Sequence, residues 1–303
     1  MSGVGRNFLV VGAGGAVGPW LVRAALTGGW SVTGLSRRAT TNYGPGYNHI
    51  VADSTEISTC RPCIERADAV IYNAAYIPAN YADPREAEAC LRVNALAPLA
   101  ILGLLVDRPR PFVYISGAQG YQVTGRLAVE DAAVFPVVHA TYYLASKLLG
   151  DIYTEHYRLT HGIPATVLRL GSIYGPGLRR GMIAHFVEQT RAGRRIILKN
   201  GGRHEADLTF LGDVGPAVLE VIRRQAQGIF NLGSGCATSA LEAARLISAA
   251  AGRSDDILEI EPDTGVKSTG GFAALDIARA TRELGYVPTP PTAGLVRTVK
   301  EWC

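Results

Sequence analysis

Tyr143 and Lys147 form a Y-x-x-x-K pattern that occurs once in the 303-residue chain. The segment around them is predicted to be helical, so the phenol and the ammonium are one turn apart and face the same way. A nearby cation stabilises a phenolate and lowers the pKa of the phenol, which gives an acid/base that can move a proton to or from an oxygen. The pair therefore predicts carbonyl and alcohol chemistry, with Tyr143 as the proton donor or acceptor.

A glycine-rich turn lies between a predicted strand and a predicted helix near the N-terminus. The apolar strand 8–11 passes directly into a seven-residue turn, Gly12-Ala13-Gly14-Gly15-Ala16-Val17-Gly18. In such a turn Gly12 allows the tight bend, Gly15 lets the backbone approach a pyrophosphate, and Gly18 permits close packing of helix on strand. The arrangement predicts that these seven residues bind a dinucleotide.

The end of the second predicted strand, 31–35, bears on the choice between NAD and NADP. Ser36, Arg37 and Arg38 follow it, where an NAD enzyme usually places an Asp or Glu against the ribose diol. A carboxylate there would repel a 2′-phosphate, whereas a hydroxyl and two guanidiniums can bind it through charge-assisted hydrogen bonds. The sequence predicts a preference for NADP(H), with NAD(H) as the alternative.

Further motifs follow in a fixed order along the chain. They are Asp53 with Ser54 after an apolar strand, Tyr72-Asn73-Ala74-Ala75, Asn94 in a helix, Leu168-Arg169-Leu170-Gly171-Ser172-Ile173-Tyr174-Gly175-Pro176, Ile229-Phe230-Asn231-Leu232-Gly233-Ser234-Gly235, and Glu283-Leu284-Gly285-Tyr286. With the glycine turn and the Tyr–Lys pair, they resemble an extended short-chain dehydrogenase/reductase of the NAD-dependent epimerase/dehydratase family. The resemblance runs nearly from end to end.

The resemblance implies roles for individual residues. Lys147 would lower the pKa of Tyr143 and hold the nicotinamide ribose, and Asn94 would steady the active-site region. Beyond the glycine turn, the implied cofactor-binding residues are Ser36, Arg37, Arg38, Asp53, Ser54, Asn73, Ala74, Ala75, Asn94, Ser116, Tyr143, Lys147, Leu170, Gly171, Ser172 and Ile173. The implied substrate-binding residues are Tyr76, Gly117, Gln119 and Ser172.

One position departs from the family's pattern. Gly117, at the end of the fifth predicted strand, stands where the family usually places a catalytic Ser or Thr. That hydroxyl donates to the substrate oxygen, and losing such a donor typically costs on the order of a few kcal/mol of transition-state stabilisation. Ser116, Gln119 or Thr141 would have to replace it, and we assign Ser116 as catalytic. The alternative is that Ser116 only caps the strand end.

Two further departures narrow the reaction. Ala118 and Gln119 stand where dehydratases of the family carry an Asp-Glu acid/base pair, which disfavours the removal of water. Ala206 stands where members that act on nucleotide sugars often carry an Arg for the diphosphate. A run of charges is more often a solvated surface, but positive charge for an anionic substrate could come from Arg179, Arg180, Lys199 and Arg203.

Composition is typical of a soluble, cytoplasmic enzyme. Thirty basic and 26 acidic residues leave a net charge of +4, too small and too scattered to indicate nucleic acid. Five cysteines suit a reduced cytoplasmic setting, and Cys60-x-x-Cys63 has no second pair or His nearby, so we expect no metal. The N-terminal apolar run indicates a strand and not a signal peptide, and the run 95–106 is too short to span a bilayer, so we expect no membrane partner.

Predicted strands alternate with predicted helices. The strands are expected at 8–11, 31–35, 49–51, 69–72, 111–115 and 165–170, and the longest helices at 84–105 and 141–161. Alternating units of this kind make an α/β fold with a doubly wound parallel (Rossmann) sheet, whose ligands lie at the carboxyl ends of the strands. A helix near 181–192 and a strand at 196–198 then predict a smaller lobe.

The expected domain division is interleaved. Residues 1–175 would form the dinucleotide-binding domain, and 205–235 would return to it, with 207–210 and 230–232 approaching the main sheet. Residues 176–204 and 236–303 would form a smaller C-terminal lobe that binds the substrate. A homodimer is expected.

The expected reaction is reversible hydride transfer between NADP(H) and a carbon that bears a hydroxyl or ketone on a sugar-like or other small carbonyl substrate. A sugar epimerase is the alternative reaction. The alternative of another class is a regulator that senses NADP(H) without turnover. Gly117 favours the regulator, whereas the intact Tyr143–Lys147 pair opposes it.

Overall fold

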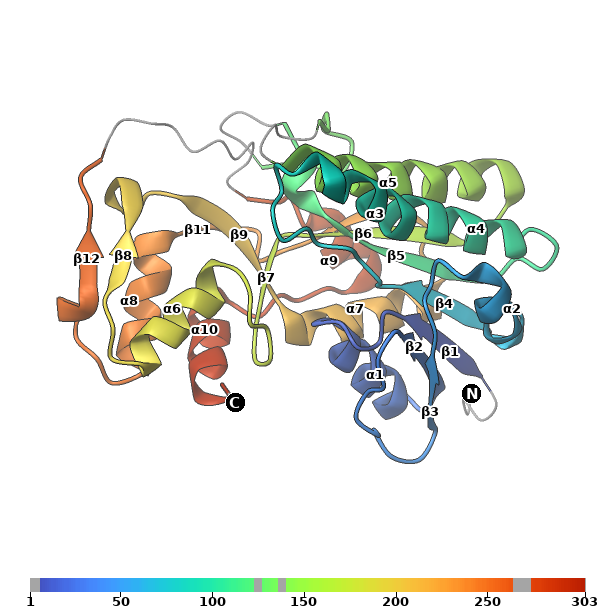
Figure 1. The fold of residues 1–303 in the computed structure, drawn as a ribbon, viewed down its shortest axis with the longest axis horizontal. Helices are drawn as coiled ribbons and strands as arrows, with labels where there is room; N and C mark the ends of the chain where they lie inside the picture. Colours follow the sequence, from blue (N-terminus) through green and yellow to red (C-terminus); the bar gives the residue numbers. More distant parts are fainter. Residues whose placement is uncertain (1–5, 123–126, 136–139, 264–273, 303) are drawn as a thin grey trace.

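The computed structural model describes residues 6–122, 127–135, 140–263 and 274–302. A parallel sheet of seven strands, in the order β10-β6-β5-β4-β1-β2-β3, forms the centre of the larger lobe (Figure 1). Its strands are β1 (Asn7–Val11), β2 (Ser31–Ser36), β3 (Tyr47–Val51), β4 (Ala69–Tyr72), β5 (Phe112–Gly117), β6 (Ala165–Leu170) and β10 (Gly228–Leu232). The six predicted strands and the doubly wound parallel sheet are confirmed.

Helices cover both faces of this sheet. Phe8 and Val10 of β1 pack on one face with α1 (Gly18–Thr27), α7 (Leu211–Arg224) and α9 (Ala278–Leu284). Leu9 and Val11 pack on the other face with α2 (Ile57–Arg66), α4 (Ala97–Leu104) and α5 (Thr141–His161). A strand buried on both faces needs a continuously apolar sequence, which is why the strand pattern is not alternating.

The helix predicted at 84–105 contains a π-helical turn. It consists of η1 (Pro84–Glu86), α3 (Ala87–Leu91), the π turn η2 (Arg92–Leu96) and α4, in direct succession. The apolar run 95–106 is thus part of a longer stretch, Pro84–Leu104, which by length and composition alone could cross a membrane. Its buried residues Ile101 and Leu102 pack into the core against the sheet, so this apolar face has a partner within the fold.

The smaller lobe has a core of its own and lies at the opposite end from α2 and α4 (Figure 1). It contains the three-stranded sheet β11-β9-β7 and the two-stranded sheet β12-β8. Its strands are β7 (Ser172–Tyr174), β8 (Ile196–Leu198), β9 (Glu205–Phe210), β11 (Ala237–Ser239) and β12 (Leu258–Ile260). Its helices are α6 (Met182–Arg191), η5 (Lys199–Gly202), α8 (Ala240–Ala250), η6 (Asp255–Ile257) and α10 (Pro291–Lys300).

The pairing of β9 differs from the expectation that 207–210 approaches the main sheet. β9 pairs in parallel with β7 and antiparallel with β11, whereas β10 joins the main sheet beside β6. Thr209 still links the two sheets, because its Oγ1 donates to Leu232 O at 2.7 Å. The boundaries proposed for the two lobes stay a prediction.

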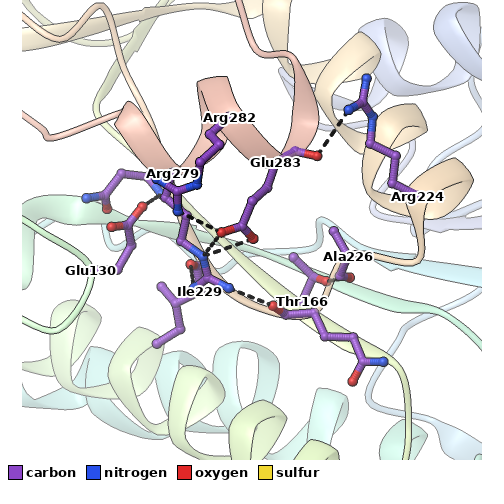
Figure 2. Close-up of polar contacts among 10 residues, drawn as sticks. Glu130, Thr166, Arg224, Ala226, Ile229, Arg279, Arg282 and Glu283 are labelled. Atoms are coloured by element: carbon purple, nitrogen blue, oxygen red, sulfur yellow. Dashed lines mark hydrogen bonds and ion pairs between the residues drawn. The ribbon is translucent and has the colours of Figure 1, made fainter.

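Side chains of α9 cover the outer edge of β10 (Figure 2). Arg279 Nη1 donates to Ile229 O at 2.7 Å, and Glu283 forms an ion pair with the same guanidinium at 3.3 Å. Glu130 Oε1 accepts the backbone amide of Asn231 at 3.1 Å. An open strand edge can pair with another chain, so these contacts protect β10 from such pairing.

Candidate active site

The glycine turn after β1 excludes side chains at two positions. Gly12 has φ +88°, and a Cβ there would collide with the backbone of Ala74. A Cβ at Gly18 would collide with Ala13 O, at the start of α1. Asn73 Nδ2 donates to Gly12 O at 2.9 Å and fixes the turn to the end of β4. A bare backbone turn in front of a helix fits the pyrophosphate of a dinucleotide.

A cavity of about 650 Å³ lies beside this turn at the carboxyl ends of the central strands. The predicted site residues that line it are Gly12, Gly14, Gly15, Ala16, Val17, Ser36, Arg37, Arg38, Asp53, Ser54, Asn73, Ala74, Ala75, Tyr76, Ser116, Gly117, Gln119, Tyr143, Lys147, Leu170, Gly171 and Ile173. Four predicted residues that the structure describes do not line it, namely Ala13, Gly18, Asn94 and Ser172. Residues that the sequence analysis missed are Leu35, Ala52, Ile77, Val93 and Ile115. Each of these is an apolar neighbour of a predicted residue, so its type gave no chemical signal.

Ser36, the last residue of β2, and Arg38 form a network with His49 of β3. Ser36 Oγ donates to Arg38 O at 2.8 Å, and His49 Nε2 lies 3.4 Å from Ser36 Oγ and 3.2 Å from Arg38 O. The Arg37 and Arg38 side chains stay exposed at the cavity. His49 was not predicted, although its strand is the neighbour of the one that carries Ser36.

Asp53 follows β3 and lines the same part of the cavity. Its Oδ1 accepts hydrogen bonds from the amide and the hydroxyl of Thr55, both at 2.9 Å. Burial acts to raise the pKa of Asp53, but these hydrogen bonds and the guanidiniums of Arg37 and Arg92 outweigh it and lower the pKa. The carboxyl group is therefore charged at neutral pH.

Tyr143 and Lys147 both line the cavity from α5. Lys147 Nζ donates to Ile115 O at 2.7 Å and lies 4.1 Å from the centre of the Tyr114 ring. Burial lowers the pKa of Lys147 to about 8, and the nearby Asp151 carboxylate opposes this shift. The ammonium is thus held at the end of β5.

Burial is the main cause of the shift in the pKa of the Tyr143 phenol. It raises the pKa of Tyr143 well above its usual value, and Tyr81 and Cys90 add to the shift. The Tyr81 ring meets the Tyr143 ring edge-on, with 5.9 Å between the centroids. The Lys147 ammonium donates to Ile115 O, and the lowering of the Tyr143 pKa by Lys147 stays a prediction.

A buried ion pair behind Lys147 was not predicted. Arg169 Nε lies 2.9 Å from Asp151 Oδ2, and the two side chains are 6% and 5% exposed. Arg169 Nη1 also donates to Tyr121 Oη at 2.9 Å. Burial raises the pKa of Asp151, and Arg169 counteracts it. The spacing of residues along the helix could have indicated Asp151. It lies one helical turn after Lys147, on the same face of α5.

Ser116 lies beside this ion pair. It is 5% exposed and acts as a hydrogen-bonding neighbour that lowers the pKa of Asp151. Among the described residues, however, Ser116 Oγ has no hydrogen bond of ordinary geometry. A small cavity of about 20 Å³, lined in part by Gly117, Lys147 and Asp151, lies next to it. The catalytic role of Ser116 stays a prediction.

Asn94, in the π turn, holds the cavity wall through its side-chain hydrogen bonds. Its Oδ1 accepts the Tyr76 amide at 2.8 Å, and its Nδ2 donates to Tyr76 O at 3.1 Å and to Ser146 Oγ at 2.9 Å. Ser146 Oγ in turn donates to Tyr143 O at 2.7 Å. Asn94 thus joins the cavity wall to the start of α5, which agrees with the steadying role that the resemblance implies.

The basic residues considered for an anionic substrate differ in their surroundings. Arg203 forms an ion pair with Asp263 at 2.6 Å, and the Arg179 guanidinium lies 4.7 Å from the centre of the Trp302 ring. Arg180 is close enough to Tyr81 to counteract the burial that raises the pKa of that phenol. Arg180 is therefore near Tyr81, the residue whose ring contacts Tyr143.

The Cys60-x-x-Cys63 pair is part of the core. Both thiols are buried in α2 and donate to backbone carbonyls, those of Asp53 and Cys60. Burial raises the pKa of Cys60 to about 11, which keeps this thiol protonated at neutral pH. Over the described ranges, no group of three His, Cys, Asp or Glu side chains is arranged to hold a metal ion.

Comparison of the chain with known proteins identifies its family. Residues 8–233 match the model of the NAD dependent epimerase/dehydratase family. The chain is 28% identical over 310 residues to a UDP-glucose 4-epimerase of Mycolicibacterium smegmatis, covering 96% of this chain and 97% of that protein. It is 26% identical over 163 residues to a dTDP-4-dehydro-6-deoxy-D-allose reductase of a Streptomyces species, covering 52% of this chain and 49% of that protein.

A solved structure has the same fold over nearly the whole chain. The UDP-glucose 4-epimerase of Thermotoga maritima, solved with UDP-glucose, has a TM-score of 0.85 at 22% identity, over 97% of this chain and 98% of that chain. The family match includes the glycine turn, the Tyr–Lys pair and most of the cavity lining. The chain therefore belongs to the NAD-dependent epimerase/dehydratase family of extended short-chain dehydrogenase/reductase enzymes.

Proposed function

We propose that the protein is an NADP(H)-dependent oxidoreductase that transfers hydride to or from the ketone or hydroxyl carbon of a sugar-like or other small carbonyl substrate. One observation carries this proposal. Two groups of residues line the same cavity: Ser36, Arg37 and Arg38 at the end of β2, and Tyr143 and Lys147 on α5. In the main sheet, β1 and β4 separate β2 from β5, the strand whose Ile115 O accepts a hydrogen bond from Lys147. A binding surface for a phosphorylated ribose and a proton-transfer group therefore share one site.

The arginines favour NADP(H) over NAD(H). Arg37 and Arg38 are exposed at the cavity and free to reach a 2′-phosphate, which Arg binds through paired hydrogen bonds. Asp53, whose carboxylate lines the cavity, already accepts two hydrogen bonds from Thr55 through Oδ1 and is close to Arg37. It is thus less available to a ribose diol than the carboxylate of a typical NAD site.

The nicotinamide of a bound cofactor would supply or accept the hydride. In reduction, Tyr143 Oη would give its proton to the substrate oxygen, and burial favours the protonated phenol that this step needs. Lys147 would place positive charge beside the reacting groups. Arg180, close to Tyr81, would attract an anionic group on the substrate.

The test is a screen of the purified protein for consumption of NADPH and NADH with free keto-sugars, nucleotide-linked keto-sugars and simple ketones. We expect net consumption of NADPH with a subset of these compounds and slower consumption of NADH. Arg37→Ala should reduce the difference between the two cofactors. Equal affinity of the wild type for both would contradict the NADP(H) preference, and binding without any turnover would favour the regulator.

A sugar epimerase is the second candidate, because the similarity to a UDP-glucose 4-epimerase extends over 96% of the chain. Ala206, on β9, counts against it, since no Arg stands there for a diphosphate. Incubation with UDP-glucose and NAD, followed by separation of UDP-glucose from UDP-galactose, distinguishes the two reactions. Inversion without net consumption of cofactor would identify an epimerase.

A further inference from the structure

The space beside Gly117 is filled by another side chain. A Cβ built at Gly117 would collide with Gln119 Oε1 and would lie 3.6 Å from Gln119 Cδ. Chain neighbours aside, no other atom of the described residues lies within 4 Å of that Cβ. Gln119 belongs to η3 (Ala118–Gly120), the short 3-10 turn that directly follows β5. The oxygen of its terminal amide, which accepts hydrogen bonds, therefore occupies the position that a side chain at residue 117 would take, and the two donors of this amide are the N–H groups of Nε2.

The backbone at Gly117 does not need a glycine. Its φ of −128° and ψ of 146° are extended values that every residue adopts. The conformation of the chain therefore does not explain why the usual hydroxyl is missing. Position 117 and the Gln119 amide share one space, and a side chain at 117 would have to shift the far end of the Gln119 side chain.

We propose that the terminal amide of Gln119 donates the hydrogen bond to the reacting substrate oxygen that a hydroxyl at position 117 would otherwise donate. Gln119, Gly117, Tyr143 and Lys147 all line the large cavity, so the amide and the phenol can reach one bound molecule. The inference rests on the proposed function, because the oxygen in question is the one at which hydride transfer creates or removes negative charge.

Ser116 is less suited to this role. Its side chain is 5% exposed and neighbours Asp151, within the group of buried charges behind Lys147. Gln119, by contrast, is exposed at the cavity. Both residues line the large cavity, but the Ser116 hydroxyl is already a neighbour of the Asp151 carboxylate, whereas the Gln119 side chain is exposed.

An amide also changes the chemistry of the site. It donates a hydrogen bond but does not release its proton near neutral pH. Every proton that reaches or leaves the substrate oxygen must therefore pass through Tyr143 Oη. Loss of the amide should reduce kcat. The midpoints of the pH–rate profile should not change, because the titrating groups stay in place.

The experiment compares five variants on a ketone or sugar that the wild type turns over: Gln119→Ala, Gln119→Glu, Gly117→Ser, Gly117→Ser/Gln119→Ala and Ser116→Ala. Gln119→Ala should reduce kcat by roughly one to three orders of magnitude, as expected for one donor to a developing oxyanion, with an unchanged Kd for NADP(H). Gln119→Glu, with nearly the same shape but no donor, should lose at least as much. The double variant should recover part of the loss, because the serine hydroxyl regains its space.

Gln122→Ala is the matched control, because Gln122 is exposed three residues further on and does not line the cavity. It should behave as the wild type. Unchanged kcat in Gln119→Ala, or a larger loss in Ser116→Ala than in Gln119→Ala, would overturn the assignment while leaving the proposed function intact. A wild type that neither oxidises NADPH nor inverts a sugar would overturn the proposed function, and the role of Gln119 with it.

Discussion

Burial shifts the pKa values of Tyr143 and Lys147 in opposite directions. Removal of water disfavours the charged form of each group, so it raises the pKa of the phenol and lowers that of the ammonium to about 8. At neutral pH the phenol therefore holds its proton and the lysine is mostly charged. This combination suits the donation of a proton to a ketone oxygen, which reduction requires.

Tyr143→Phe tests the phenol alone. It removes one oxygen and preserves the ring contact with Tyr81, so we expect turnover to fall by at least about 100-fold while cofactor Kd and Tm stay unchanged. Steady-state kinetics and cofactor titration measure the two effects. Tyr142→Phe is the control, because Tyr142 is on the same helix and does not line the cavity. Full activity in Tyr143→Phe would exclude the assigned role.

The pKa of Lys147 predicts how cofactor binding depends on pH. In the folded protein the lysine is charged below about pH 8 and loses its proton as the pH rises through that value. The Kd for NADP⁺, titrated from neutral to alkaline pH, should increase with an inflection near about pH 8, because the site then loses a positive charge. Lys147→Met should bind more weakly and show no inflection there. Persistence of the inflection in that variant would assign it to another group.

The π turn connects the cavity wall to α5, the helix that carries Tyr143 and Lys147. A π turn inside a helix re-aims one residue and often occurs at functional sites. Here it presents Asn94, fully buried, to Tyr76 on one side and to Ser146 of α5 on the other. One helix therefore fixes both the cavity wall and the backbone that carries Tyr143.

Asn94→Ala should weaken both stability and activity. Truncation leaves the part-buried Tyr76 amide and carbonyl without the partners they now have, at a cost of up to about 1–3 kcal/mol for each group. We expect a lower Tm and a reduced kcat, measured by thermal unfolding and by kinetics on the same sample. Glu88→Ala is the control on the exposed side of α3 and should change stability by less than about 0.5 kcal/mol. A wild-type Tm in Asn94→Ala would contradict the role of Asn94 in holding the cavity wall and α5 together.

The elements that the sequence predicted well depend on local patterns. Apolar strands followed by glycine or polar residues identify β1 to β6, and the Tyr143–Lys147 spacing identifies one face of α5. The π turn was not predictable, because Arg92 to Leu96 has an ordinary helical composition and its geometry depends on contacts with Tyr76 and α5. The Asp151–Arg169 pair likewise depends on the packing of two separate elements, α5 and β6.

On the scale of the whole molecule, Asp207 joins three separate segments of the chain at the junction of the two sheets. Its Oδ1 accepts the Ser234 amide at 2.6 Å and the Ser234 hydroxyl at 2.8 Å. Its Oδ2 accepts the Gly235 amide at 3.1 Å and the Leu275 amide at 2.8 Å. The placement of β9 in the smaller sheet, which the sequence did not predict, is what brings this carboxylate to the junction.

Asp207→Asn should destabilise the fold strongly. An amide of the same size turns an NH₂ group toward backbone N–H donors, so at least one buried hydrogen bond to a charge is replaced by a repulsive contact, at a cost of roughly 1.5–3 kcal/mol or more. Chemical denaturation measures the loss. Asp255→Asn is the control, since its ion pair with Arg245 is exposed and worth about 0–1 kcal/mol. Equal stability of the two variants would contradict the structural role of Asp207.

This junction also constrains the order in which the chain can fold while it is being synthesised. The donors to Asp207 lie 27, 28 and 68 residues further along the chain. At a translation rate of about 5–20 residues per second, the last of them emerges roughly 3–14 seconds after the carboxylate that needs it. β1 to β6 can pair during that time, whereas Asp207 of β9 gains the last of its four hydrogen bonds only after Leu275 has emerged. We therefore expect nascent chains that end before Leu275 to protect the cofactor-binding strands from a protease and to leave β9 open to cleavage.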